Sequence, residues 1–111
     1  LIYNSLNFWT SPDVYEPEGG EKFEHVKDRV VPLIKGIINK CDGKNVLIVT
    51  HAVTLKVIMA YFENTPLEEL WHTPYIHQTS LSQVNIQNGQ ATVILHGDSS
   101  HLGKVNKVET V

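Results

Sequence analysis

Apolar residues recur at helical spacing in two stretches of the chain. The first stretch covers residues 21–40 and the second covers residues 53–62, in which Lys56 marks the side expected to face solvent. Such spacing gives each segment one apolar stripe, so both are predicted to be amphipathic helices. Pro32 lies inside the first helix and is expected to kink or interrupt it. The apolar positions of the first helix are Phe23, Val26, Val30, Leu33, Ile34, Ile37 and Ile38.

Three other segments have the pattern of β-strands. Residues 46–49 are apolar at every position, which is typical of a central, parallel strand covered on both faces. Residues 80–87 and 90–96 are two further strand-like runs, separated by the pair Asn88-Gly89, a strong signal for a tight hairpin turn. We therefore expect an α/β fold in which an antiparallel hairpin lies at the edge of a mixed sheet.

The most informative position is the junction between the buried strand and the second helix. His51 follows residues 46–49 almost directly, and helical spacing begins at Val53. In open α/β sheets, ligands bind at the carboxyl ends of the strands, and the N–H groups at a helix start favour an anion. His51 is therefore a candidate site residue. The alternative is a structural histidine in an ordinary strand-to-helix turn.

Composition restricts the class of protein. A chain of 111 residues with 41% hydrophobic content is sufficient for one core, so residues 1–111 are expected to form a single unit. The net charge of -3 and the scattered basic residues argue against nucleic-acid binding. No long apolar segment predicts a membrane span. The single Cys41 excludes an internal disulfide and favours a reducing, cytoplasmic location.

The six histidines raise the question of a metal site. His72 and His77 are five positions apart, a spacing that does not place two ligands on one face of a helix. No carboxylate or cysteine completes a recognised pattern of ligands around them. We therefore expect neither a metal nor a cofactor, and His25 is expected to lie in solvent on the first helix.

Several short motifs resemble those of one enzyme family. The run Val-Leu-Ile-Val-Thr-His-Ala at residues 46–52 resembles the second-histidine motif of the histidine phosphatase superfamily, the phosphoglycerate mutase-like enzymes. Gly-Glu at residues 20–21, with Arg29 downstream, resembles the Gly-Glu-Ser segment of that family, although Lys22 replaces the serine. The run from Gln78 to Leu81 is similar to the entry to its hairpin, and residues 97–102 are similar to its Asn-Asp-x-x-His-Leu ending.

This resemblance carries expectations about fold and site. It implies that residues 1–111 are the C-terminal portion of a three-layer α/β/α domain with a mixed, mostly parallel sheet. It also implies that His51 is catalytic, that Ala52 and Val53 contact the substrate, and that the substrate is a phosphorylated small molecule. The family transfers a phosphoryl group to a nucleophilic histidine in an Arg-His-Gly motif, and this motif does not occur in the sequence.

Three functions follow from these expectations. The first is the C-terminal portion of a phosphomonoesterase that works through a phosphohistidine intermediate and is inactive alone, without the nucleophile. The second is phosphoglycerate mutase-type phosphoryl transfer in a longer chain, and the third is a non-catalytic α/β module for binding or assembly. Without the absent half, residues 46–49 would form an uncovered sheet edge, so self-association through that edge is expected.

Overall fold

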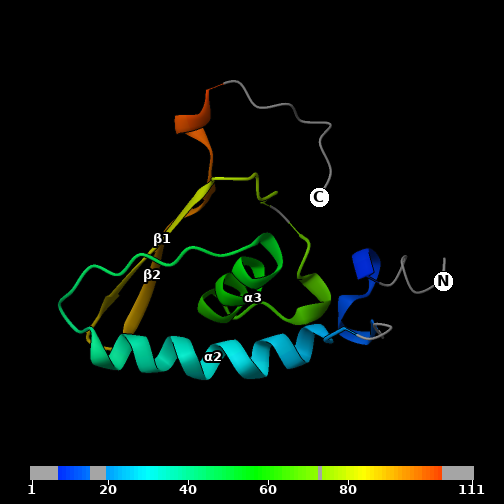
Figure 1. Ribbon diagram of the computed structural model, residues 1–111, viewed down its shortest axis with the longest axis horizontal. Helices are drawn as coiled ribbons and strands as arrows, with labels where there is room; N and C mark the ends of the chain where they lie inside the picture. Colours follow the sequence, from blue (N-terminus) through cyan, green and yellow to red (C-terminus); the bar gives the residue numbers. More distant parts are fainter. Residues whose placement is uncertain (1–7, 16–19, 73, 104–111) are drawn as a thin grey trace. The chain divides into compact units, whose positions relative to one another are not determined.

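The computed structural model describes residues 8–15, 20–72 and 74–103 of the chain. The chain divides into two compact units, Leu1–Thr73 and Pro74–Val111. The first unit contains the helices α2 (Phe23–Lys40) and α3 (Ala52–Glu63) and the short 3-10 helices η1 (Pro12–Val14) and η2 (Leu67–Glu69). The second unit contains the strands β1 (Leu81–Gln87) and β2 (Gln90–Asp98) and the 3-10 helix η3 (Ser100–Leu102). Figure 1 shows these elements in sequence colours.

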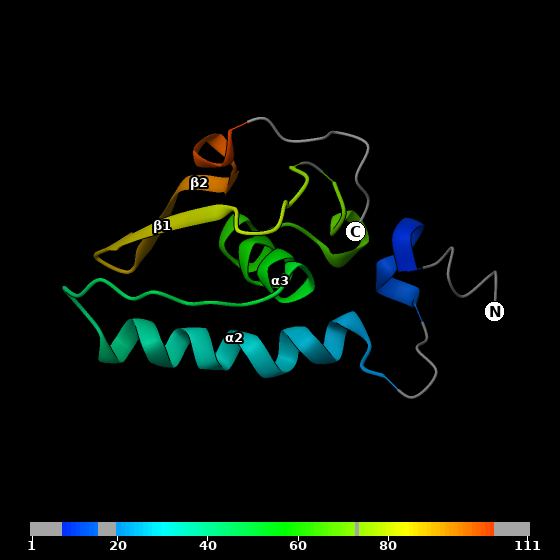
Figure 2. The same cartoon turned by 45° about the horizontal axis from the view of Figure 1, so that its top comes forward.

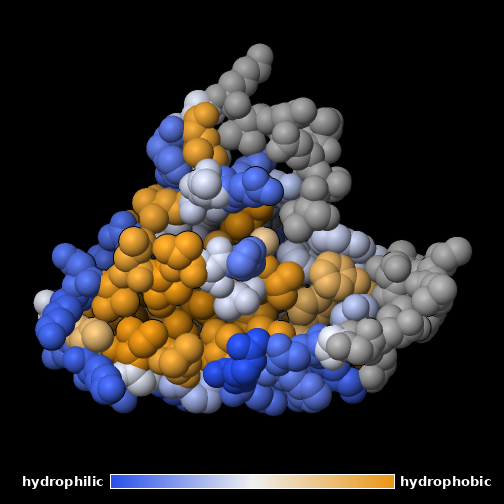
Figure 3. All heavy atoms as spheres, in the orientation of Figure 1, coloured by the Kyte–Doolittle hydropathy of each residue, from blue (hydrophilic) through white to orange (hydrophobic). Residues whose placement is uncertain are grey.

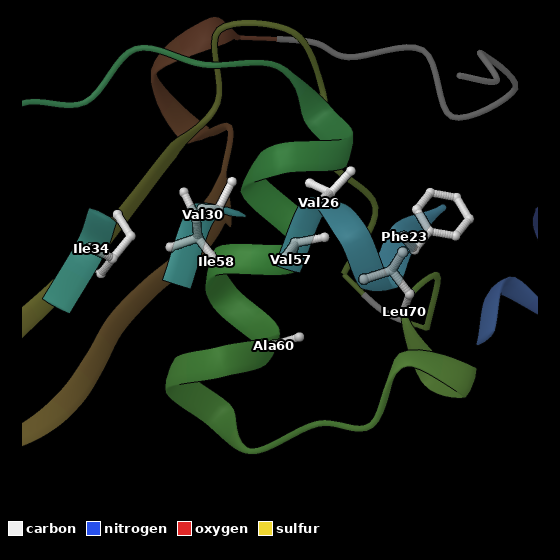
Figure 4. Close-up of a cluster of buried hydrophobic side chains, with 8 residues drawn as sticks. All are labelled: Phe23, Val26, Val30, Ile34, Val57, Ile58, Ala60 and Leu70. Atoms are coloured by element: carbon white, nitrogen blue, oxygen red, sulfur yellow. The ribbon is translucent and has the colours of Figure 1, made fainter. Parts of the chain in front are cut away.

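The core of the first unit forms where α2 packs against α3. Both predicted helices are present, and the apolar stripe of α2 lies against the buried face of α3 (Figure 4). Burying an aliphatic or aromatic side chain of this size contributes about 1.5–3 kcal/mol, so this contact stabilises the unit. The cluster of buried side chains consists of Phe23, Val26, Val30, Ile34, Val57, Ile58, Ala60 and Leu70.

Two details of α2 differ from the prediction. Leu33 was expected on the apolar stripe but is 63% exposed. The buried face of α2 is formed by Phe23, Val26, Val30 and Ile34, and Leu33 lies outside it. Pro32 was expected to kink or interrupt the helix; an interruption is absent, since α2 runs from Phe23 to Lys40 with Pro32 inside it. Proline removes one hydrogen-bond donor from the helix, and the packing of the buried side chains before and after it keeps the helix continuous.

An aromatic cluster extends the core beyond the start of α2. The ring of Phe8 lies 5.1 Å from that of Phe23 and 5.3 Å from that of Tyr15, measured between centroids. Trp71, which follows η2, packs against the same group, and its indole Nε1–H donates a hydrogen bond to the Phe8 carbonyl oxygen at 2.8 Å. Trp71 is thus fixed both by ring contacts and by a satisfied polar group.

The predicted central strand is absent from the described part of the chain. Residues 45–50 form no strand, and Leu47 and Val49 are 83% and 87% exposed. The expectation of a strand covered on both faces is therefore wrong for this structure. A strand requires a neighbouring strand for its backbone groups, and no described residue makes a backbone hydrogen bond to residues 45–50. Figure 2 shows the segment running back along α2 towards the start of α3.

The second unit confirms the predicted hairpin. β1 and β2 pair antiparallel, with Gln87 opposite Gln90 beside the turn and Val84 opposite Val93 further along. Asn88 and Gly89 have φ values of 52° and 75°, as a tight hairpin turn requires. The sheet formed by the described residues consists of these two antiparallel strands. Together with the helices of the first unit, it makes the molecule a small α/β structure. The described residues also contain no helix that is long and apolar enough to cross a membrane.

Gly97 closes the second unit tightly and generates a prediction. It has a φ of +72°, and a Cβ atom at this position would lie 2.7 Å from Cδ1 of the buried Ile76. Gly89 has a similar φ of +75° but nothing within 4 Å. Gly89→Ala should destabilise the hairpin by about 1–2 kcal/mol, since it introduces only a left-handed alanine. Gly97→Ala should cost about 1 kcal/mol more, because Ile76 must also move.

Amide hydrogen exchange along β1 measures both losses in the same element. Because both variants place an alanine at a similar positive φ, a larger loss at position 97 than at position 89 is expected from the contact with Ile76. Equal protection in the two variants would show that Ile76 yields without cost.

Lys56 differs most from its predicted environment. It was expected to mark the exposed side of α3, but the residue is 5% exposed. Its Nζ donates a hydrogen bond to the His72 carbonyl oxygen at 2.8 Å, so the long aliphatic stem is buried while the ammonium group still has an acceptor. Burial lowers the pKa of Lys56 from its ordinary value of 10.5, and the charge of Glu63 opposes that shift.

The lowered pKa of Lys56 predicts a pH dependence of stability. Between the lowered pKa of the folded state and 10.5, the unfolded chain binds more protons than the folded chain. The free energy of unfolding should therefore gain a positive contribution as pH rises through this window. Lys56→Met should lack this contribution. Urea denaturation of both proteins at a series of alkaline pH values measures the difference, and identical pH slopes would contradict the prediction.

Candidate functional site

His51 stands directly before α3. It is the N-cap residue of that helix, with extended backbone angles of φ -109° and ψ 166°, and its carbonyl oxygen accepts the first helical hydrogen bond from the Leu55 N–H at 2.9 Å. The residue is exposed, and its side chain makes no capping hydrogen bond. Within the described residues, no hydrogen bond or ion pair involves the His51 ring. The ring is therefore available to a ligand from solvent.

The start of α3 supplies further donors next to His51. Ala52 and Val53 are the first two residues of the helix and are partly buried, and Val53 packs against the core of the first unit. The first N–H groups of a helix have no partner within it, and they carry the positive end of the helix dipole. The first turn of α3 contains no acidic residue. An anion placed at this end would meet backbone donors and no opposing carboxylate from the same turn.

Glu21 and Arg29, both singled out by motif resemblance, form an ion pair at the start of α2. The guanidinium group binds both carboxylate oxygens, at 2.7 Å to Oε1 and 3.2 Å to Oε2. Hydrogen bonding by Arg29 lowers the pKa of Glu21, and the pKa of Arg29 is raised in turn. Glu21 precedes Phe23, where the helix begins, so this exposed ion pair links the residues before α2 to the second turn of that helix.

In the second unit, two motif segments meet. The His101 ring contacts the Thr79 carbonyl oxygen, with 2.8 Å from Nε2 to O, and Thr79 has a left-handed φ of 59°. The Ser82 hydroxyl accepts a hydrogen bond from the Gly97 N–H at 2.9 Å. These two contacts thus connect the start of the hairpin with its end and with the residues after it. These contacts give the similar motifs at residues 78–81 and 97–102 a structural role in closing the hairpin.

The other histidines lie in separate environments. His25 is exposed on α2, as predicted, and His72 lies 3.6 Å from the Glu69 carboxylate, measured from Nδ1 to Oε1. The ring of His77 lies 4.5 Å from that of Tyr75, edge to face. A search of the described residues finds no group of three or more histidine, cysteine or acidic side chains that could hold a metal ion.

The structure places the three predicted site residues at one helix start, and their roles stay predictions. His51, Ala52 and Val53 are consecutive at one helix start, so the proposed site residues do lie together. Nothing in the described residues joins them to Glu21 or Arg29 by a hydrogen bond or an ion pair. Sequence reasoning noted Glu21 and Arg29 only as separate motif residues. Glu21 and Arg29 are eight positions apart, about two helical turns. Residues at this spacing lie on the same side of a helix, so an acid just before the helix can reach an arginine on it.

Comparison with known proteins identifies relatives of this chain. It is 35% identical to the 2,3-bisphosphoglycerate-dependent phosphoglycerate mutase of Cytophaga hutchinsonii over 66 residues. The matched region covers 58% of this chain and 31% of that protein. The chain is 42% identical to the fructose-2,6-bisphosphatase of Saccharomyces cerevisiae over 55 residues. The matched region covers 50% of this chain and 12% of that protein. This chain therefore spans less than half of the length of either relative.

A solved structure and a family model extend the comparison over most of the chain. The structure of YhfR from Bacillus stearothermophilus matches with a TM-score of 0.85 and 39% identity, over 91% of this chain and 50% of that one. Residues 3–99 match the model of the histidine phosphatase superfamily, branch 1. Together with the order of the motifs around His51, these matches show that the chain belongs to the histidine phosphatase superfamily.

Proposed function

We propose that this chain is the C-terminal portion of a phosphomonoesterase, in which His51 stabilises the phosphoryl group during transfer. The observation that carries the proposal is the position of His51, exposed at the N-terminus of α3 with its ring open to solvent. Relatives that act on phosphorylated substrates, a mutase and a bisphosphatase, support the reaction class. The substrate is accordingly a phosphorylated small molecule.

His51 and α3 have complementary roles in this proposal. As a phosphoryl group is transferred, negative charge on its oxygens must be stabilised by donors that are already in place. An imidazole N–H of His51 donates one hydrogen bond, and the backbone N–H groups of Ala52 and Val53 donate from the helix start. His51 is the N-cap residue of α3, directly before the first helical N–H groups, so the ring and the helix start are proposed to serve one anion.

The nucleophile is expected outside these residues. The reaction proposed here proceeds through a phosphohistidine, and the sequence contains no Arg-His-Gly motif. Its single arginine, Arg29, is already engaged with Glu21 and does not serve as a phosphate clamp. We therefore propose that the chain is inactive alone. In a complete domain, we propose, residues 46–49 become a central strand of a three-layer α/β/α sheet, in a cytoplasmic enzyme.

Phosphoglycerate mutase-type transfer is the second candidate. The match to a phosphoglycerate mutase favours it, whereas the match to a fructose-2,6-bisphosphatase favours hydrolysis. The two reactions share the phosphohistidine step and differ in the acceptor, which is a substrate hydroxyl in one and water in the other. A third possibility, a non-catalytic binding module, requires no phosphoryl chemistry at His51 and is separated from both by the experiments below.

The first test removes the His51 ring from a chain that contains both this segment and an Arg-His-Gly motif. His51→Ala should lower kcat for p-nitrophenyl phosphate by about two to four orders of magnitude, because it removes an oxyanion donor and any proton transfer that the ring performs. His25→Ala is the matched control, since His25 is an exposed histidine on α2 and not one of the proposed site residues. The chain of 111 residues should show no turnover. Near wild-type activity in His51→Ala would identify His51 as structural.

The second test uses inorganic phosphate and the 111-residue chain. Because His51 and the α3 N–H groups are present without an arginine clamp, phosphate should bind weakly, in the millimolar range. The His51 ring resonances should shift in an NMR titration at constant pH and ionic strength, while those of His25 should stay constant. An unchanged His51 signal at high millimolar phosphate, or equal shifts at both rings, would argue against an anion site.

A further inference from the structure

The turn of the hairpin contains an asparagine followed by a glycine, Asn88 and Gly89. The turn and the residues beside it, Gln87 and Gln90, are exposed and carry no charge. Hydrophilic residues gather at the left edge of Figure 3, the end of the view at which Figure 1 draws the turn. Asn88 has a left-handed φ of 52°, a conformation that asparagine tolerates better than most residues. Solvent therefore reaches the side-chain amide of Asn88 and the residue that follows it.

A second exposed asparagine has a similar backbone conformation and provides a comparison. Asn64, directly after α3, has a φ of 56°. The next residue, Thr65, is β-branched, and its N–H donates a hydrogen bond to the Ala60 carbonyl oxygen at 2.9 Å. The backbone nitrogen that follows Asn64 is therefore crowded by a stiff side chain and held by a hydrogen bond.

The backbone nitrogen that follows Asn88 has neither restraint. Gly89 has no side chain, and nothing lies within 4 Å of the position that a Cβ atom would take there. Among the described residues, the backbone hydrogen bonds outside the helices and strands do not include the Gly89 N–H. This nitrogen can therefore approach the side-chain carbonyl carbon of Asn88 without losing a hydrogen bond or displacing a neighbouring group.

We propose that the open turn makes Asn88 a site of spontaneous deamidation through a cyclic succinimide. The Gly89 backbone nitrogen attacks Cγ of Asn88 within the same chain, so that a C–N bond forms and the Cγ–Nδ2 bond breaks. The proton of the Gly89 N–H leaves with the amide nitrogen as ammonia. Water then adds to either carbonyl carbon of the ring and breaks one of its C–N bonds, which gives aspartate or isoaspartate. Either product adds one negative charge to the turn.

The isoaspartate product also changes the length of the turn. In isoaspartate the main chain passes through Cβ and Cγ, so the turn gains one backbone atom. The register places Gln87 opposite Gln90, which leaves two residues for the turn. Because the turn fixes the register of the strands that it joins, the longer backbone should weaken the pairing of β1 with β2. The proposal concerns a modification of the hairpin and is independent of the reaction assigned to His51.

The experiment is incubation of the wild-type 111-residue chain in mildly alkaline buffer, followed by proteolysis and mass spectrometry of the fragments. Asn88 should deamidate roughly tenfold faster than Asn64, because its neighbouring nitrogen is uncrowded and loses no hydrogen bond on attack. Thr65→Gly is the matched control: it creates a second Asn-Gly pair at a similar φ, while the N–H at position 65 keeps its acceptor. Asn64 in this variant should still react more slowly than Asn88.

The products and their effect on the hairpin complete the test. Both aspartate and isoaspartate should form at position 88, since water can open the ring at either carbonyl carbon. The amides of β1 should lose protection from hydrogen exchange in the isoaspartate form and keep it in Asn88→Asp, which carries the same charge on a turn of normal length. An unchanged Asn88, equal rates at Asn88 and Asn64 in either chain, aspartate as the sole product, or full protection of β1 in the isoaspartate form would each overturn the proposal.

Discussion

The packing of α2 against α3 determines the geometry of the candidate site. Val26 and Val30 of α2 meet Val57 and Ile58 of α3, and this contact fixes the axis of α3 in the first unit. A helix that is only marginally stable in isolation gains most of its stability from such an apolar face. The direction of the N–H groups at Ala52 and the place of His51 therefore follow from aliphatic side chains buried further along the two helices.

Local patterns predicted the elements whose stabilising contacts lie close in sequence. The spacing from Phe23 to Ile34 was sufficient for α2, and Asn88-Gly89 was sufficient for the hairpin turn, since each signal acts within a few residues. Residues 46–49 had an equally clear pattern and form no strand. A strand depends on a neighbouring strand, which its own residues cannot specify. The pattern therefore showed that the segment is suited to a strand, but it could not show whether a neighbouring strand is present.

The place of His51 in the fold was predictable from the sequence, and its surroundings were predictable only in part. His51 lies at a helix start because the apolar run before it ends and helical spacing begins after it, and both features are visible in the sequence. Lys56 was assigned to the wrong side of α3, because a charged residue was taken as exposed. Its acceptor is a backbone oxygen of His72, sixteen residues away, and no side-chain pattern indicates a carbonyl group at that distance.

The hydrogen bond from Trp71 to Phe8 has a consequence for synthesis of the chain. The two residues are 63 positions apart, yet they belong to one aromatic cluster of the first unit. At about 5–20 residues per second, translation takes roughly 3–13 s to add the residues between them. During that interval Phe8 and Tyr15 have no partner from the end of the unit. The aromatic cluster is therefore completed only when Trp71 has been synthesised, late in the translation of the first unit.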